Sequence, residues 1–209
     1  LLADAAAARQ LAQKRYTSSA LMFYWAIAGD RSPQLLHHNL FLADHQYKQS
    51  FDQIFRNLTL PDEPSIYINA ASRSDATVAP PEGDAIMALV PVGHINDAQP
   101  QDWAALRQRA RQTVLARLES MGVAGAQQRI LHEATLGPHD YAHDLNLAKG
   151  AAFGLSHDFW QVGYLRPRNR HARYGNLYFV GASTHPGTGL PIVLLSARLV
   201  AERIAAEQT

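Results

Sequence analysis

The residues best suited to chemistry form a glycine-rich stretch close to the C-terminus, which includes Gly181, Gly187 and Gly189. The apolar run at residues 177–180 before it predicts a buried strand, and the apolar stripe that begins at Ile192 predicts a helix. Glycines at such a turn let the backbone approach a ligand closely, and the N-terminus of the helix favours an anionic or electron-rich one. The spacing is neither G-x-G-x-x-G nor G-x-x-x-x-G-K-[ST], so a ligand-binding turn and a plain connection both stay open.

Other reactive side chains give weaker signals. His185 lies in the same stretch and could act as an acid or base, but we expect it to order the turn by hydrogen bonding. His139 and His143 have the i, i+4 spacing of two metal ligands on one helix face, yet no H-E-x-x-H motif occurs, and we expect no metal site. No residue identifies itself as the catalytic one. The absence of cysteine excludes disulfides, thiolate ligands and a cysteine nucleophile.

A basic run precedes the turn. It consists of Arg166, Arg168, Arg170 and Arg173, and it is broken by Pro167. Such a run predicts a solvated loop, with contact to phosphate, either of a cofactor or of lipid headgroups, as the functional alternative.

Composition limits the class of protein. The chain has 209 residues, 47% hydrophobic and 18% charged, with a net charge of +1, which is ordinary for a globular protein and gives no case for nucleic-acid binding. No apolar run is long enough to span a bilayer, while attachment to a membrane surface stays open.

Hydrophobic periodicity predicts a mixture of helices and strands. Helices are expected at 2–14, 45–55 and 101–121, with a short helical piece at 137–146, and strands at 19–28, 36–42, 65–70, 85–92 and 129–135. Each helix is expected to have an apolar face. In the helix at 45–55 it consists of Tyr47, Phe51 and Ile54 or Phe55, and in the last helix it consists of Ile192, Leu195, Leu199 and Ile204. In the helix at 101–121 it consists of Trp103, Leu106, Ala110, Val114, Leu118 and Met121. No regular βαβ rhythm appears, so the fold class is predicted to be α+β.

Three motifs occur in order along the chain. The first runs from Leu60-Pro-Asp-Glu-Pro-Ser-Ile-Tyr-Ile-Asn69 through Ser72-Arg-Ser-Asp75 and Ala79-Pro-Pro-Glu-Gly83 to Leu89-Val-Pro-Val-Gly-His94. The second is Tyr164-Leu-Arg-Pro-Arg-Asn-Arg170, and the third is Val180-Gly-Ala-Ser-Thr-His-Pro-Gly-Thr-Gly-Leu-Pro-Ile-Val193. Together they resemble the phytoene desaturases, FAD-dependent carotenoid enzymes related to the amine oxidases, over nearly the whole chain.

The resemblance implies an antiparallel-sheet substrate domain with capping helices, followed by the last strand and C-terminal helix of an incomplete Rossmann-like FAD domain. The substrate domain would take up residues 1–160, and residues 161–209 would complete the FAD domain. The family's N-terminal G-x-G-x-x-G motif does not occur in the chain. We therefore expect a C-terminal portion that lacks the N-terminal FAD-binding half, with a natural short protein as the alternative.

The resemblance also implies a function and a cofactor site. The function would be dehydrogenation of a C40 polyene by hydride transfer to FAD in carotenoid biosynthesis, with this chain alone inactive. The flavin contacts would come from Gly181, Ala182, Thr184, Gly187, Gly189, Leu190, Pro191 and Ile192. The alternatives are a carotenoid cis–trans isomerase, another amine oxidase-like flavoprotein, or a non-catalytic remnant that binds apolar ligands.

The implied partners are the hydrophobic polyene, the missing N-terminal half and a membrane surface. Attachment would be peripheral, on the cytoplasmic side, through the apolar run Leu21–Ile27 and the basic group Arg166–Arg173. Some aromatic side chains are expected to line an apolar tunnel for the substrate. The candidates are Phe23, Tyr24, Trp25, Phe153, Phe159 and Trp160.

Overall fold

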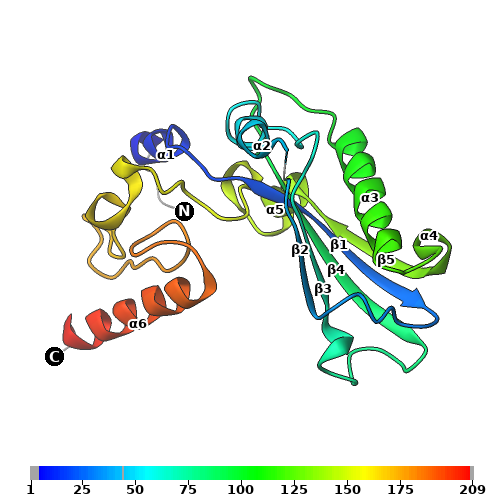
Figure 1. The fold of residues 1–209 in the computed structure, drawn as a ribbon. Coiled ribbons are helices and arrows are strands. Elements are labelled where there is room, and N and C mark those ends of the chain that lie inside the picture. Colours follow the sequence, from blue (N-terminus) through cyan, green and yellow to red (C-terminus); the bar gives the residue numbers. More distant parts are fainter. Residues whose placement is uncertain (1–4, 44, 208–209) are drawn as a thin grey trace. The chain divides into compact units, whose positions relative to one another are not determined.

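The computed structural model describes residues 5–43 and 45–207, and the chain divides into two compact units (Figure 1). The sheet unit comprises Ser18–Gly150, and the terminal unit comprises Leu1–Thr17 with Ala151–Thr209. The chain leaves the sheet unit at Gly150. The first residues group with the last because Tyr16 forms a β-bridge with Leu155 and the Thr17 N–H donates to the Gly154 carbonyl.

The sheet unit is built on a five-stranded sheet in which every neighbouring pair is antiparallel. Its strands are β1 (Ser19–Ala28), β2 (His38–Phe41), β3 (Ile66–Ala70), β4 (Gly83–Val92) and β5 (Ile130–Leu136), in the spatial order β2-β3-β4-β1-β5. The five predicted strands are all present, with ends that differ by a few residues. Together with the helices they confirm a mixed helical and antiparallel-sheet fold.

The core lies between one face of this sheet and α3 (Trp103–Ser120), as Figure 1 shows. Alternate residues of β1, β3 and β4 point to this face, as expected for half-buried strands. The helix buries Ala110, Val114 and Leu118 of the predicted face, with Trp103, Leu106 and Met121 packed against the core at its edges. The buried strand residues are Leu21, Phe23, Trp25, Ile27, Ile66, Ile68, Ala70, Ile86, Ala88, Val90 and Val92.

Burial of β1 corrects the expected membrane contact of Leu21–Ile27. This run is a central strand paired on both edges, and its larger side chains Leu21, Phe23 and Trp25 lie in the core. Phe23 and Trp25 are therefore core residues rather than parts of a substrate tunnel.

Shorter helices cover the ends of the sheet unit. They are α2 (Tyr47–Phe55), α4 (Ala126–Arg129) and α5 (Pro138–Asp144). In α2, Ser50 and Ile54 are buried, whereas Tyr47, Phe51 and Phe55 are exposed and contact one another along the helix. The prediction that Tyr47, Phe51 and Phe55 form the buried face of α2 is thus wrong, whereas Ile54 is buried as predicted.

The terminal unit contains α1 (Ala5–Ala12) and α6 (Leu190–Glu207) joined by turns and 3-10 helices. The predicted helix at 2–14 corresponds to α1, and its residues 2–4 lie outside the described residues. The strand predicted at 177–180 is wrong. Within the described residues the run forms only one antiparallel bridge, between Tyr178 and Arg170, with backbone hydrogen bonds to residues 169 and 171 on either side.

The last helix begins at Leu190, two residues before the predicted start, and Pro191 occupies its first turn, where a missing N–H costs nothing. Its buried residues are Ser196 and Val200. The predicted apolar stripe is not the buried one, since Ile192, Leu195 and Leu199 are exposed within the described chain.

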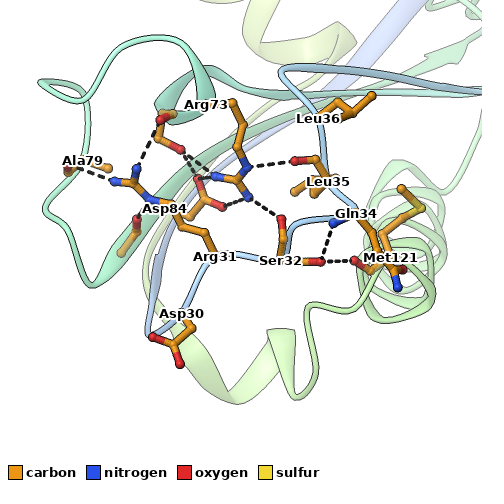
Figure 2. Close-up of polar contacts among 12 residues, drawn as sticks. Asp30, Arg31, Ser32, Gln34, Leu35, Leu36, Arg73, Ala79, Asp84 and Met121 are labelled. Atoms are coloured by element: carbon orange, nitrogen blue, oxygen red, sulfur yellow. Dashed lines mark hydrogen bonds and ion pairs between the residues drawn. The ribbon is translucent and has the colours of Figure 1, made fainter.

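A buried polar cluster holds the loops at one end of the sheet (Figure 2). The Arg73 guanidinium binds the Asp84 carboxylate at 2.8 and 3.2 Å, and Ser72 donates to the same carboxylate. Arg73 also donates to the carbonyls of Ser32 and Leu35. The cluster therefore joins the start of β4 to the loop that follows β1.

Arg31 anchors the proline-rich part of the first motif in the same region. Its guanidinium donates to the carbonyls of Gly83 at 2.8 Å, Pro80 at 2.9 Å and Ser72 at 3.1 Å. Asp75 is exposed and accepts hydrogen bonds from the N–H and hydroxyl of Thr77, which lower the pKa of its carboxyl group. The motif thus shapes a loop around two arginines.

Candidate functional site

The glycine-rich turn leaves its backbone open at two positions. Gly181 and Gly189 have φ angles of +135° and +101°, which L-residues rarely adopt. A Cβ atom at Gly181 would meet nothing within 4 Å, and one at Gly189 would meet only Ile192 Cγ1 at 4.0 Å. The backbone at these two glycines therefore faces open space.

Hydrogen bonding in the turn is one-sided. The carbonyl groups of Ala182, Thr184 and His185 accept hydrogen bonds from side chains of the terminal unit. In contrast, the N–H groups of Ala182, Ser183, Gly187 and Gly189 have no acceptor within the described chain. Buried carbonyls and free N–H groups together make this turn a donor surface suited to an anionic or electron-rich ligand.

Arg166 supports the turn from inside. It is 2% exposed, so it is not part of the solvated or membrane-facing basic group that the sequence predicts. Its Nε atom donates to the Thr184 carbonyl at 3.1 Å, and one terminal nitrogen donates to the Ala182 carbonyl. The remaining bonds go to carbonyls of Leu155, Ser156 and Gln161.

Asn169 ties the turn to α6. Its amide nitrogen donates to the carbonyls of Phe179 at 3.1 Å and His185 at 2.8 Å, and to the Ser196 hydroxyl at 3.0 Å. Ser196 in turn donates to the His185 carbonyl at 2.9 Å. The buried side of α6 therefore carries a polar residue, Ser196, whose hydroxyl joins the helix to the turn.

Two histidines lie in the turn region. The His185 N–H donates to the Pro167 carbonyl at 2.9 Å, and its ring Nδ1 lies 3.2 Å from the Gly163 carbonyl, so this residue orders the turn as expected. His157 Nε2 accepts from the Thr188 N–H at 3.4 Å and lies beside Gly187. Partial burial and the positive charge of Arg166 lower the pKa of His157, which keeps the imidazole neutral as an acceptor.

The residues expected to contact flavin are not equally open. Gly181 and Gly189 contribute open backbone, Ala182 is half-buried, and Gly187 is buried beside His157, whose Nε2 would lie 3.0 Å from a Cβ atom at that position. The Thr184 hydroxyl is turned inward to the Gly181 carbonyl at 3.0 Å. The other three residues, Leu190, Pro191 and Ile192, form the exposed first turn of α6.

Sequence reasoning missed the supporting residues Arg166, Asn169 and Ser196. Arg166 and Asn169 both lie in the second motif, so the motif was the available signal, but its basic character pointed to solvent. Ser196 carried no signal, because a lone serine on a helix is ordinary.

A second candidate surface is the face of the sheet opposite α3. The strand register aligns five side chains across all the strands, namely Leu40, Tyr67, Leu89, Met22 and Leu136. The next row contains His38, Asn69, Met87, Tyr24 and Ala134. None of these side chains is fully buried in the described chain, so the sheet presents a continuous, mainly apolar face.

The remaining aromatic candidates divide between the units. Tyr24 lies on this open face, while Phe153, Phe159 and Trp160 are exposed in the terminal unit. Among residues 5–43 and 45–207, no cluster of three or more histidine and carboxylate side chains has the arrangement of a metal site. None of the helices described is both long and apolar enough to cross a membrane.

Comparison with known proteins places these features in a family. Residues 39–205 match the profile of the flavin containing amine oxidoreductases. The chain is 45% identical over 202 residues to a phytoene desaturase of Neurospora crassa, covering 96% of this chain and 34% of that protein. It is 46% identical over 191 residues to a zeta-carotene-forming phytoene desaturase of Myxococcus xanthus, covering 91% of this chain and 36% of that protein.

A more distant relative carries a different activity in its name. The chain is 36% identical over 179 residues to a 4,4'-diapolycopene oxygenase of a Methylomonas species, covering 84% of this chain and 35% of that protein. The chain thus spans about a third of the length of these curated relatives. The matches confirm the resemblance on which the sequence analysis relies.

Proposed function

Because this chain belongs to the family of flavin containing amine oxidoreductases, we propose that it is the C-terminal part of an FAD-dependent carotenoid desaturase that dehydrogenates a C40 polyene. The observation that carries the proposal is the turn at residues 181–189, whose free N–H groups and open glycines form a donor surface. The relatives named as phytoene desaturases support the choice of reaction.

The turn and the first turn of α6 hold the flavin part of FAD in this proposal. FAD held there would supply the hydride acceptor for a dehydrogenation in which the substrate also loses a proton from the neighbouring carbon. The free N–H groups of Ala182 and Gly189 and the N-terminus of α6 would stabilise negative charge on the electron-rich edge of the ring. The open backbone at Gly181 and Gly189 lets the ring approach closely.

The open sheet face holds the polyene. A substrate without polar groups is recognised by shape and dispersion, which require a broad apolar surface. The aligned side chains Leu40, Tyr67, Leu89 and Met22 supply such a surface across the strands. In this assignment the sheet unit is the substrate domain.

The terminal unit completes a Rossmann-like FAD domain with an N-terminal half supplied by the rest of the protein. The exposed stripe of α6, with Ile192, Leu195 and Leu199, supports this proposal because it is a helix face with no cover in the described chain. The same half brings the pyrophosphate-binding unit, so this chain alone binds FAD weakly and is inactive.

The cofactor site is tested by replacing Gly189 with valine in the complete enzyme. A β-branched residue resists the φ angle of +101° and projects into the open space above the turn, so FAD occupancy falls. Gly125→Val is the control, because Gly125 also has a positive φ of +62° but lies at the start of α4. The flavin content of each purified variant is measured by absorbance. Full occupancy in Gly189→Val would remove the turn from the cofactor site.

The reaction is tested by pigment analysis. A host supplied with phytoene and expressing the complete enzyme accumulates desaturated products with longer conjugated systems. Isomers of unchanged oxidation state would point to a cis–trans isomerase, and oxygenated products would point to an activity like that of the Methylomonas relative. No change in pigment would favour the non-catalytic alternative.

Contact with a membrane surface, on the cytoplasmic side, is part of the proposal because the substrate is a bilayer-resident hydrocarbon. The exposed side chains Tyr47, Phe51 and Phe55 of α2 supply apolar area for this contact. The complete enzyme is expected to sediment with anionic liposomes. The double variant Phe51→Ser, Phe55→Ser should sediment with them less than the unmodified enzyme at every salt concentration. Unchanged sedimentation in this double variant would place the contact elsewhere.

A further inference from the structure

Arg166 is a buried cation without a counter-ion. Among residues 5–43 and 45–207, no carboxylate lies within 4.0 Å of its guanidinium group, although the side chain is only 2% exposed. All five of its N–H donors go instead to backbone carbonyls, at Leu155, Ser156, Gln161, Ala182 and Thr184.

Comparison with Arg73, whose side chain is 17% exposed, shows what is unusual here. Arg73 faces the Asp84 carboxylate at 2.8 Å, so its charge is neutralised by a partner. Carbonyl dipoles satisfy the hydrogen bonds of Arg166 but carry no net charge. A full positive charge therefore remains beneath the turn, where burial makes its field stronger than in water.

The effect of this charge reaches the surface of the turn. The pKa of His157 is lowered first by burial and then by the charge of Arg166, and His157 accepts from the Thr188 N–H. Burial also lowers the pKa of the Arg166 guanidinium itself, which nevertheless stays charged at neutral pH.

We propose that Arg166 is a positioning residue for the cofactor, which turns the carbonyls of Ala182 and Thr184 inward and favours the negatively charged, reduced state of the flavin bound outside. The inference rests on the proposed function of the turn. With the carbonyls drawn inward, the N–H groups of Ala182 and Ser183 stay free for the ligand. The uncompensated charge then stabilises the reduced flavin more than the neutral oxidised one.

Charge and geometry are separated by two substitutions in the complete enzyme. Arg166→Gln removes the charge, while Arg166→Lys keeps it and loses most of the carbonyl contacts. Arg168→Gln is the matched control, because it removes the charge of an exposed arginine two residues away in the same loop. The measurements are the dissociation constant for FAD, the midpoint potential of the bound flavin and the thermal unfolding of the FAD-free protein.

We expect Arg166→Gln to weaken binding of reduced FAD relative to oxidised FAD by about tenfold, which lowers the midpoint potential by about 30 mV for a two-electron couple. Arg166→Lys should bind FAD more weakly but keep the potential close to that of the unmodified enzyme. Arg168→Gln should change neither quantity. If Arg166 had a purely structural role, its replacement would lower the thermal stability and leave the midpoint potential unchanged. The potential therefore distinguishes the two roles.

An unchanged potential in Arg166→Gln, with or without weaker FAD binding, overturns the inference. If Arg166→Gln does not fold, Arg166→Lys provides the test. A midpoint potential in Arg166→Lys that is about 30 mV lower than in the unmodified enzyme would overturn the inference, because this variant keeps the charge. These outcomes leave the proposed function intact as long as Gly189→Val loses flavin. Failure of the unmodified complete enzyme to bind FAD would instead refute the proposed function itself.

Discussion

Replacing Asp84 with asparagine removes the only negative charge in contact with the buried Arg73 among the described residues. The two side chains are 6% and 17% exposed, and they are joined by two hydrogen bonds of 2.8 and 3.2 Å. The amide keeps the shape of the carboxylate and one acceptor oxygen, but its NH₂ group faces a donor of either Arg73 or Ser72. The substitution therefore leaves a buried guanidinium without a counter-ion.

The expected loss in free energy of unfolding follows from that geometry. Removing one partner of a buried ion pair typically costs 3–5 kcal/mol, and the retained oxygen places this case at about 3 kcal/mol. The double variant Asp84→Leu, Arg73→Met removes both charges and should cost less than Asp84→Asn alone. Asp52→Asn is the control, because it breaks an exposed pair with Arg56 in the same sheet unit and should cost less than about 0.5 kcal/mol.

Urea denaturation followed by tryptophan fluorescence measures these changes. Trp25 is buried in the sheet unit and Trp103 packs at the edge of its core, so both report on this unit. Trp160 is exposed in the terminal unit, and a Trp160→Phe background removes its signal. A loss below about 1 kcal/mol for Asp84→Asn, or a double variant less stable than the single one, would refute the view that the pair holds the loops.

Further predictions concern backbone packing and pH. Gly150→Ala should lower stability by at least about 2 kcal/mol in thermal denaturation, because its Cβ would lie 2.0 Å from the Pro138 carbonyl oxygen at a φ of +61°. Gly163→Ala, with a φ of +57° and free space around its Cβ, should cost about 1 kcal/mol at most. Burial lowers the pKa of His94 in the folded protein below its usual 6.5, so the unfolded chain binds the proton more tightly than the folded one. The contribution of neutral His94 to stability is therefore complete above pH 6.5 and is lost as the pH falls through the pKa of the folded state. His94→Gln should therefore flatten the decline in stability between about pH 7.5 and 5.5, and an unchanged slope in urea titrations would contradict this assignment.

The sheet unit was largely predictable from its sequence because its patterns are local. Alternation along β3 and the helical face of α3 each follow from which side chains must leave water. The run at 19–28 was read correctly as a strand, yet its apolar density also suggested a membrane contact. Only the three-dimensional structure shows that Leu21, Phe23 and Trp25 are already covered in the core against α3.

The terminal unit was harder to predict because its order depends on contacts between distant residues. Arg166 and Arg168 are alike in sequence, but one is buried by carbonyls from three segments and the other is exposed. Nothing in the local pattern distinguishes them. The glycine-rich turn was recognisable from its composition, whereas the inward direction of its carbonyls required the positions of Arg166 and Asn169.

The chain enters and leaves the sheet unit at neighbouring points. Tyr16 pairs with Leu155 on the terminal side, and the Ser19 hydroxyl donates to the Gly150 carbonyl at 2.6 Å on the sheet side. The sheet unit is therefore an insertion whose two ends nearly meet, an arrangement that permits a whole domain to be exchanged without rebuilding its host. A scaffold of this kind can keep the glycine-rich turn of the terminal unit unchanged while the inserted sheet varies.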